Sequence, residues 1–171
     1  MAARYAKPIS ERPRVLQLMT PLQLYHSWPL LAHDGRLDLG RLLGAEVLRG
    51  TDFATLDDDM LAAWGIGRWA CDLTDNRLSW TDPVFDLFGL PRGADLARDD
   101  VVALYREESR AAMDHLRAYA IRHRRGFTID AEIRTVAGDR RWMRLLASPI
   151  CDGDRVVRLQ GLKQDISYSY R

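Results

Sequence analysis

Three alternating runs lie in the C-terminal third of the chain. Apolar and polar residues alternate over 127–134, over 141–147 and over 156–166. Turns that contain Gly and Asp, at 137–139 and 151–154, separate these runs. Period-two alternation joined by short turns predicts an antiparallel meander of three strands. Such a sheet has two distinct faces, and at least one of them must be buried against other elements.

Composition limits the classes of protein to which the chain can belong. Its 171 residues, 47% of them apolar, suffice for one domain with an appended segment. The net charge of +1 provides no basic field for nucleic acid. No apolar stretch reaches the ~20 residues of a membrane span, and no signal peptide is recognisable. Cys71 and Cys151 do not form a disulfide framework, so we expect reduced thiols in a cytoplasmic protein.

Residues 1–53 are predicted to be an N-terminal extension that caps or dimerises the main domain. Residues 1–20 carry two prolines among mixed charges, which indicates an extended arm. Residues 21–50 are too apolar for a solvated linker, and a helix ended by Gly50 is expected within them. Four of their apolar residues recur at helical spacing: Leu39, Leu42, Leu43 and Val47. The sequence leaves open whether this segment packs on the main domain or on a partner.

Residues 54–171 are predicted to form the main domain, and its first half combines a helix with a hairpin. A helix is expected over 55–64, with three aspartates in its first turn, where negative charge suits the helix dipole. Strands are expected over 66–73 and 77–80, joined by an Asp-Asn turn.

Further helices are expected before the meander. The first begins at Asp82-Pro83, with the Asp82 carboxylate as its cap, and stops at Gly89. Others are expected over 99–105 and 107–125, the longer one ended by Gly126. This order of elements predicts an α+β fold, a five-stranded antiparallel sheet with short helices on one face.

Two groups of residues in this order are similar to a known family. The first group is Gly65–Trp69, Leu78–Asp82 and Phe88–Leu90. The second group is Arg134, Gly138-Asp139, Arg141-Trp142, Pro149, Gly153, Gly161 and Asp165–Ser167. The first resembles the opening of a PAS domain and the second its closing PAC segment, over roughly residues 54–168. The likeness is to the PAS subclass of bacterial signalling proteins, except that Tyr105-Arg106 stands where that subclass usually has His-Pro.

This resemblance implies a sensory module of signal transduction. Such modules hold a small molecule, or nothing, between sheet and helices, pass strain through the sheet to a partner protein or fused output domain, and commonly form homodimers. A ligand-free interaction or dimerisation module is the alternative. The chain is either a stand-alone regulator or part of a longer receptor. No convergent acid, base and nucleophile can be assembled from its motifs, so we expect no enzymatic activity.

The resemblance places a candidate pocket between sheet and helices. Its predicted lining is Trp69, Phe85, Phe88, Tyr119, Gly161 and Lys163. Lys163 shares a strand face with Gly161, and a buried lysine there requires an acidic partner or an anionic ligand. Alternatively, Lys163 pairs with a protein carboxylate or reaches water at the rim. Other aromatic residues that either line a pocket or fill a core are Trp80, Tyr105, Phe127 and Trp142.

Sequence motifs identify no cofactor. Flavin-binding relatives of the LOV type use a cysteine within Asn-Cys-Arg, a motif that this chain lacks. Haem-binding relatives place a histidine on the long helix, but Ala112 stands at the corresponding position, and His115 and His123 lie elsewhere. No histidine pair or Cys/His cluster has metal-site spacing. The sequence therefore favours neither flavin, haem nor metal, and it leaves the ligand unidentified.

Overall fold

The computed structural model describes residues 41–42, for which it gives the backbone pairing, and residues 56–170. Its helices are α2 (Asp58–Ala63), α3 (Asp82–Phe88), α4 (Arg98–Ala103), α5 (Glu107–His123) and the 3-10 helix η2 (Ser167–Tyr170). Its strands are β1 (Arg41–Leu42), β2 (Ile66–Asp72), β3 (Leu78–Trp80), β4 (Phe127–Arg134), β5 (Arg140–Asp152) and β6 (Arg155–Asp165).

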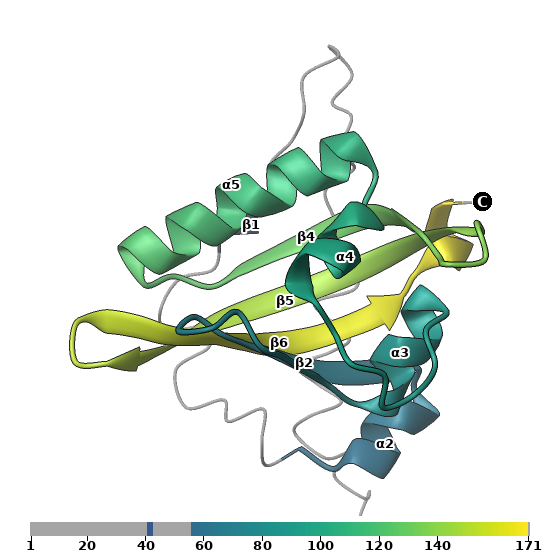
Figure 1. Cartoon of the computed structure of the whole chain (residues 1–171), viewed down its shortest axis with the longest axis horizontal. Helices are drawn as coiled ribbons and strands as arrows, with labels where there is room; N and C mark the ends of the chain where they lie inside the picture. The colour runs from purple at the N-terminus through teal and green to yellow at the C-terminus, as the bar shows by residue number, and fades with distance from the viewer. Residues whose placement is uncertain (1–40, 43–55, 171) are drawn as a thin grey trace, which may run out of the picture.

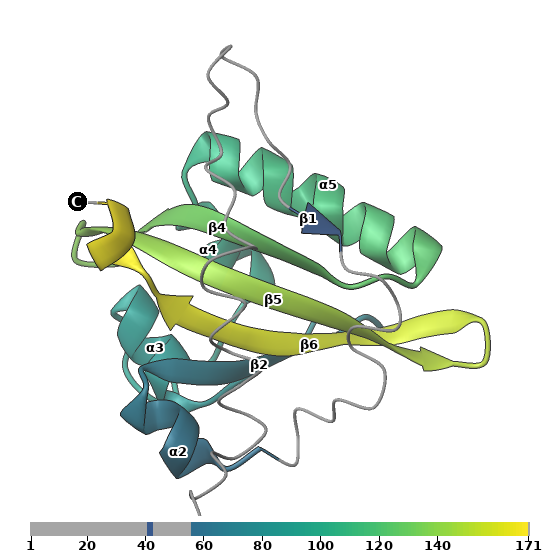
Figure 2. The ribbon, with the colours of Figure 1, turned by 180° about the vertical axis from the view of Figure 1, so that it is seen from behind.

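The described strands form one antiparallel sheet. Their order across the sheet is β1-β4-β5-β6-β2-β3, so the meander β4-β5-β6 lies beside the hairpin β2-β3. Helices α3, α4 and α5 cover one face, which we call the inner face (Figure 1). The opposite, outer face is turned toward the viewer in Figure 2. The predicted α+β fold, with five strands and helices on one face, is confirmed for the main domain.

The sheet also contains a short strand from the N-terminal extension. In β1, Arg41 pairs with Thr128 of β4 and Leu42 pairs with Phe127. The helix predicted to run through Leu42 is therefore wrong at these two residues. The edge of β4 presents backbone N–H and C=O groups that a neighbouring strand satisfies, and this pairing overrides helical spacing. The rest of the predicted helix, and the predicted arm, lie outside the described residues.

The main core lies between the inner face and the helices. Its buried residues come from both layers, and those at most 1% exposed are Val84, Phe88, Ala112, Ala120, Phe127, Ile129, Ala131, Ile133, Met143, Ala147 and Leu159. Gly67 lets α3 approach β2 closely. A Cβ at Gly67 would lie 2.4 Å from Cγ2 of Val84 and 2.9 Å from the Val84 nitrogen. Any larger residue there would push α3 away from the sheet.

Two helix starts differ from the prediction in their caps. Asp57 precedes α2, and its carboxylate accepts hydrogen bonds from the backbone N–H groups of the second and third helical residues. It therefore acts as the N-cap, whereas the prediction placed it inside the first turn. Helix α3 has Thr81 as its N-cap, without a side-chain hydrogen bond, and Asp82 as its first residue. The predicted capping role of Asp82 is therefore wrong, although Pro83 lies in the first turn as expected.

Two further boundaries were misplaced by the sequence patterns. Helix α5 ends at His123, with Arg124 in a left-handed conformation at φ 54°, so the helix stops two residues before its predicted end at residue 125. Strand β5 continues past the predicted end at residue 147 to Asp152. It accommodates Pro149 opposite Leu159, just before a register shift between Ile150 and Cys151. A proline is tolerated in a strand near such irregularities.

The outer face carries a second, smaller apolar cluster and a buried ion pair. Leu61 of α2 packs there against Ile66, Leu146 and Leu162. Nearby, Asp130 accepts two hydrogen bonds from Arg144, at 2.8 and 2.9 Å.

The C-terminal helix η2 is attached to the same face. Tyr170 donates to the Asp130 carboxylate at 2.7 Å, and its ring stacks on Trp142 with 4.1 Å between centroids. Along β5, Trp142 alternates with Met143, which belongs to the main core. The end of β6 and the turn after it are thereby held on the sheet.

Within the described segments, no helix has the length and apolar character needed to cross a membrane.

Candidate functional site

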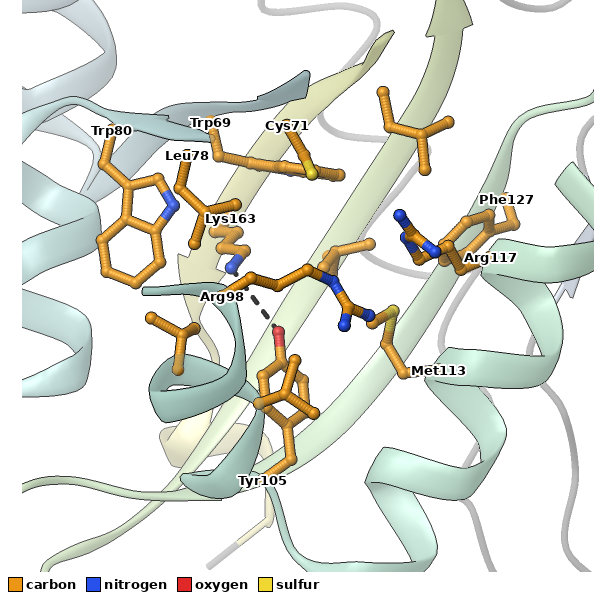
Figure 3. A pocket seen from close by; sticks show the side chains of 14 residues that line it. Trp69, Cys71, Leu78, Trp80, Arg98, Tyr105, Met113, Arg117, Phe127 and Lys163 are labelled. Carbon is orange, nitrogen blue, oxygen red and sulfur yellow. Dashed lines mark hydrogen bonds between the residues drawn. The ribbon is translucent and has the colours of Figure 1, made fainter. Parts of the chain in front are cut away.

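A small cavity lies between the inner face of the sheet and helices α4 and α5 (Figure 3). Its volume is about 50 Å³. The residues around it come from five elements of the sheet and from both helices and the segment between them. They are Trp69, Cys71, Leu78, Trp80, Arg98, Val101, Val102, Tyr105, Met113, Arg117, Phe127, Leu145, Leu159 and Lys163. The cavity therefore lies between sheet and helices, where the resemblance implied a pocket.

Lys163 is the buried charged residue of this cavity. It lies on the inner face of β6, opposite Leu145 of β5 and Gly67 of β2, and it is 5% exposed. Its ammonium nitrogen is surrounded by three aromatic rings: the centroids of Trp69, Trp80 and Phe88 lie 5.4, 4.9 and 4.7 Å away. Rings at this distance attract a cation through their quadrupole, and they offset part of the cost of its burial.

Among the described residues, the polar surroundings of Lys163 contain no carboxylate. Its Nζ donates to the hydroxyl of Tyr105 at 3.5 Å, which the dashed line in Figure 3 marks. None of the ion pairs in the described part of the chain involves Lys163. Burial lowers the pKa of Lys163 to about 7, and the neighbouring Cys71 opposes this shift. The predicted alternative, in which a protein carboxylate neutralises Lys163, is not found among the described residues.

Further hydrogen-bond donors surround the cavity. Nε1 of Trp80 is buried and has no hydrogen-bond partner within residues 56–170. Figure 3 shows this nitrogen on the side of the indole that faces Lys163. Burial also raises the pKa of Tyr105, so its hydroxyl keeps its proton at neutral pH.

Two arginines complete the lining. Arg98 of α4 pairs with Asp114 at 3.3 Å and with Asp99 at 3.8 Å. Arg117 of α5 donates to the side-chain oxygen of Asn76 at 3.2 Å. These guanidinium groups are only partly buried, so their charges are already compensated by neighbours and by solvent.

Of the six residues predicted to line the pocket, the structure places Trp69 and Lys163 in the lining. Phe88 lies just behind it, since its ring contacts Lys163 and stacks on Trp80 at 4.9 Å. Phe85 packs edge-on against Trp80 at 5.4 Å and belongs to the core. Tyr119 lies outside the lining and contacts His123 on α5, with 4.2 Å between ring centroids.

Gly161, the sixth predicted residue, is needed for packing of the sheet. A Cβ at this position would lie 1.8 Å from the carbonyl oxygen of Leu146. That same oxygen accepts a hydrogen bond of 3.2 Å from Nε1 of Trp69. The missing side chain at Gly161 thus allows the Leu146 carbonyl to anchor the indole that forms one wall of the cavity.

The predicted set omitted several lining residues. The sequence analysis named three of them, Trp80, Tyr105 and Phe127, as aromatic residues that either line a pocket or fill a core. Their contacts with the cavity depend on strand register and on the path of the chain after α4, which the sequence pattern does not give. Nothing in the sequence indicated that Arg98 and Arg117 line the cavity, because charged residues at helical positions are usually solvated.

The cysteines and histidines that the structure describes do not gather at the cavity as a reactive cluster. Cys71 is buried and lines the cavity, Cys151 is exposed on β5, and both are free thiols. His115 is exposed on α5. Among the described residues, no three His, Cys, Asp or Glu side chains lie close enough to hold a metal ion. A volume of about 50 Å³ is also far below the ~300 Å³ of a typical cofactor pocket.

Comparison with solved structures identifies the fold. One match is a sensory box histidine kinase/response regulator from Burkholderia thailandensis E264, 16% identical, with a TM-score of 0.57 over 65% of this chain and 84% of that chain. Another is the N-terminal domain of a diguanylate cyclase with PAS/PAC sensor from Marinobacter aquaeolei, 17% identical, with a TM-score of 0.57 over 62% and 99%.

A third match is an RNA-binding light-oxygen-voltage receptor, 19% identical, with a TM-score of 0.54. It covers 62% of this chain but only 30% of that receptor. No protein-family profile and no curated protein matches the sequence. At these identities the similarities establish the fold alone: the described part of the chain has the PAS fold, as the sequence motifs predicted.

Proposed function

We propose that this protein is a sensory module of signal transduction that responds to a small ligand in the cavity beside Lys163. The carrying observation is the cavity itself, which lies between the sheet and helices and is lined by the buried side chain of Lys163. The similar structures include a sensory box histidine kinase and a PAS/PAC sensor of a diguanylate cyclase, so signalling is the common context of the fold. In this proposal the ligand shifts the protein toward the conformation that it binds better. This shift changes the packing of the sheet and thereby the affinity for a partner.

The path from the cavity to the C-terminal end is short. Lys163 faces the cavity, and β6 ends two residues later at Asp165. Ser167 then donates its backbone N–H to Asp165, and its hydroxyl accepts from the backbone N–H of Trp142. A displacement of β6 at the cavity therefore acts on the contacts that hold the C-terminal turn against the outer face.

A second candidate function is a ligand-free interaction or dimerisation module. The small cavity volume favours it, because an almost filled core leaves room for only a few atoms. In this case the outer face and the N-terminal extension bind a second copy or a partner protein. Both candidate functions are non-catalytic.

Ligand screening separates the two candidates. Native mass spectrometry and an absorption spectrum of freshly purified protein detect a species that copurifies. Thermal shifts across a metabolite library detect one that is lost in purification. A sensory module is expected to be stabilised by particular small ligands, because a ligand that binds only the folded state raises the melting temperature.

The control in the same screen is a variant with a blocked cavity, Leu159→Trp. Its residue is 1% exposed and lines the cavity beside Lys163. Stabilisation that disappears in this variant locates the ligand in the cavity. If no compound stabilises the wild-type protein and no bound species is found, the sensory proposal fails and the interaction module remains.

A further inference from the structure

The cavity contains hydrogen-bond donors for which residues 56–170 provide no matching acceptor. Lys163 Nζ has three hydrogens and one weak acceptor, the Tyr105 hydroxyl at 3.5 Å. Tyr105 accepts from Lys163, so its own hydrogen stays available. Trp80 Nε1 is buried without a partner in the described residues. Buried polar groups without partners are costly, and each one requires an explanation.

We infer that the cavity binds a small planar oxyanion, with Lys163 as its counter-charge and the Trp80 and Tyr105 side chains as hydrogen-bond donors. This inference rests on the proposed ligand-sensing function and names the chemical class of the ligand. A short-chain carboxylate is the biological source that it favours. Its two oxygens match donors that converge from β3, β6 and the segment after α4 (Figure 3).

The size of the cavity restricts the anion. About 50 Å³ is the room that roughly one or two water molecules occupy in the liquid. Formate, acetate and nitrate are of that size, whereas di- and tricarboxylates and nucleotides are far larger. Apart from Cys71 and the two arginines, the remaining lining is apolar and includes Leu145, Leu159 and Phe127, so a methyl group is accepted as well as an oxygen.

Charge excludes the opposite class of ligand. A cation would face Lys163, Arg98 and Arg117, while the acidic neighbours Asp99 and Asp114 are already paired with Arg98. A neutral ligand of the same shape would accept hydrogen bonds but leave the buried ammonium uncompensated. An anion both accepts the hydrogen bonds and compensates the buried ammonium. The second effect matters more, because a buried charge without a partner costs more free energy than a buried hydrogen-bond donor without an acceptor.

Binding of the anion is coupled to protonation of Lys163. The titratable and charged groups that face the cavity are Lys163, Tyr105, Cys71, Arg98 and Arg117. With its pKa at about 7, Lys163 is largely neutral at pH 8.5, and the anion then has to recruit a proton in order to bind. The affinity is expected to fall about tenfold or more between pH 6.5 and 8.5, because each pH unit above the pKa reduces the protonated fraction about tenfold.

The composition of the chain makes a direct test practical. Lys7 and Lys163 are its only lysines. In protein labelled with ¹³Cε-lysine, NMR therefore shows two lysine signals, and the variant Lys163→Met assigns them. Sodium acetate is titrated against sodium chloride at constant ionic strength, with formate and nitrate as alternative oxyanions. Acetamide serves as the neutral analogue of the same shape.

The expected result is a saturable shift of the Lys163 signal with acetate or formate, no such shift with chloride or acetamide, and a higher pKa for Lys163 when acetate is bound. Acetate also raises the melting temperature of the wild type but not that of Lys163→Met. The variant Trp80→Phe keeps the ring but removes the donor, and it weakens binding about tenfold, the effect of one hydrogen bond to a charged group. The variant Arg122→Gln, which removes an exposed charge, binds as the wild type does.

Other results overturn the inference. If chloride or acetamide shifts the NMR signal of Lys163 as acetate does, Lys163 is not the counter-charge of an oxyanion. The same conclusion follows if acetate still raises the melting temperature of Lys163→Met. A response to nitrate without one to carboxylates retains the oxyanion site but refutes the carboxylate source. If an uncharged metabolite stabilises the protein while no anion does, the anion site is refuted and the sensory function stands.

Discussion

At the scale of single residues, the choice of lysine at position 163 is unusual for this chain. Only two of its 25 basic residues are lysines, and the rest are arginines. A guanidinium remains charged in proteins, whereas a buried ammonium readily loses its proton. The cavity therefore holds a cation whose charge is adjustable, and Trp69, Trp80 and Phe88 provide partial compensation when it is charged.

The lowered pKa of Lys163 predicts a pH dependence of stability. The ordinary lysine pKa is 10.5, and burial lowers that of Lys163 to about 7. Between these pH values the unfolded chain binds more protons than the folded chain, so stability rises with pH. We expect the free energy of unfolding of the wild type, relative to Lys163→Met, to rise by roughly 1 kcal/mol per pH unit between about pH 7 and 9.

Urea unfolding at pH 6, 7, 8 and 9 measures this difference. Other groups titrate in both proteins, so their contributions cancel in the comparison. Below pH 7 Lys163 is protonated in both states, and the two curves are expected to run parallel there. Curves that stay parallel up to pH 9 would mean that Lys163 keeps an ordinary pKa in the folded protein.

At the scale of elements, the close approach of α3 to β2 shapes one side of the cavity. Helix α3 provides Phe88, which stacks on Trp80 and contacts Lys163. Its distance from the sheet is set where Val84 rests on the backbone of Gly67. This contact therefore controls both the core and the aromatic surroundings of the lysine.

The variant Gly67→Ala is expected to destabilise the fold by about 1–3 kcal/mol, the usual cost of overpacking a core. The added methyl group would lie 2.4 Å from Cγ2 of Val84, so the helix has to move outward. Chemical denaturation of Gly67→Ala, Val84→Ala and the double variant measures the coupling. We expect the loss of stability in the double variant to be smaller than the sum of the two single losses, because the double variant lacks the Cγ2 atom of Val84 that the new methyl group would meet. Additive losses would place the strain elsewhere.

At the scale of the whole molecule, the extension and the main domain are connected by the sheet. Strand β1 pairs with the edge of β4, while η2 packs on the outer face at the other end of the chain. The apolar segment 21–50, which is predicted to pack on the main domain or on a partner, belongs to the same extension as β1. This arrangement is consistent with a homodimer that buries the extension, which we propose as the oligomeric state.

Deletion of residues 1–50 tests this proposal. Light scattering coupled to size exclusion is expected to give a dimer for the full chain and a monomer of lower solubility for the deletion, since the edge of β4 then loses its partner strand. Deletion of residues 1–20 alone is the matched control, because it keeps β1 and the apolar segment, and it should remain dimeric. An unchanged mass and solubility after removal of residues 1–50 would contradict the proposal.

Sequence patterns alone determined the type and order of the elements in the main domain. Alternation over 127–134 and 156–166 requires strands with one buried face, and this requirement acts locally, within a few residues. The strand face shared by Gly161 and Lys163 followed from the same periodicity, whereas the burial of that lysine was left open until the structure showed it. Motif spacing then selected the PAS fold among the α+β possibilities.

Only the tertiary structure decided which side chains meet. Register set Trp69 opposite Gly161, and the carbonyl of Leu146 thereby anchors the indole. The path of the chain after α4 brought Tyr105 to Lys163 across 58 positions of sequence. Pairing with β4 made a strand of Arg41–Leu42 despite their helical spacing. Such contacts join residues that are distant along the chain, and their energies depend on packing and desolvation, which local periodicity does not encode.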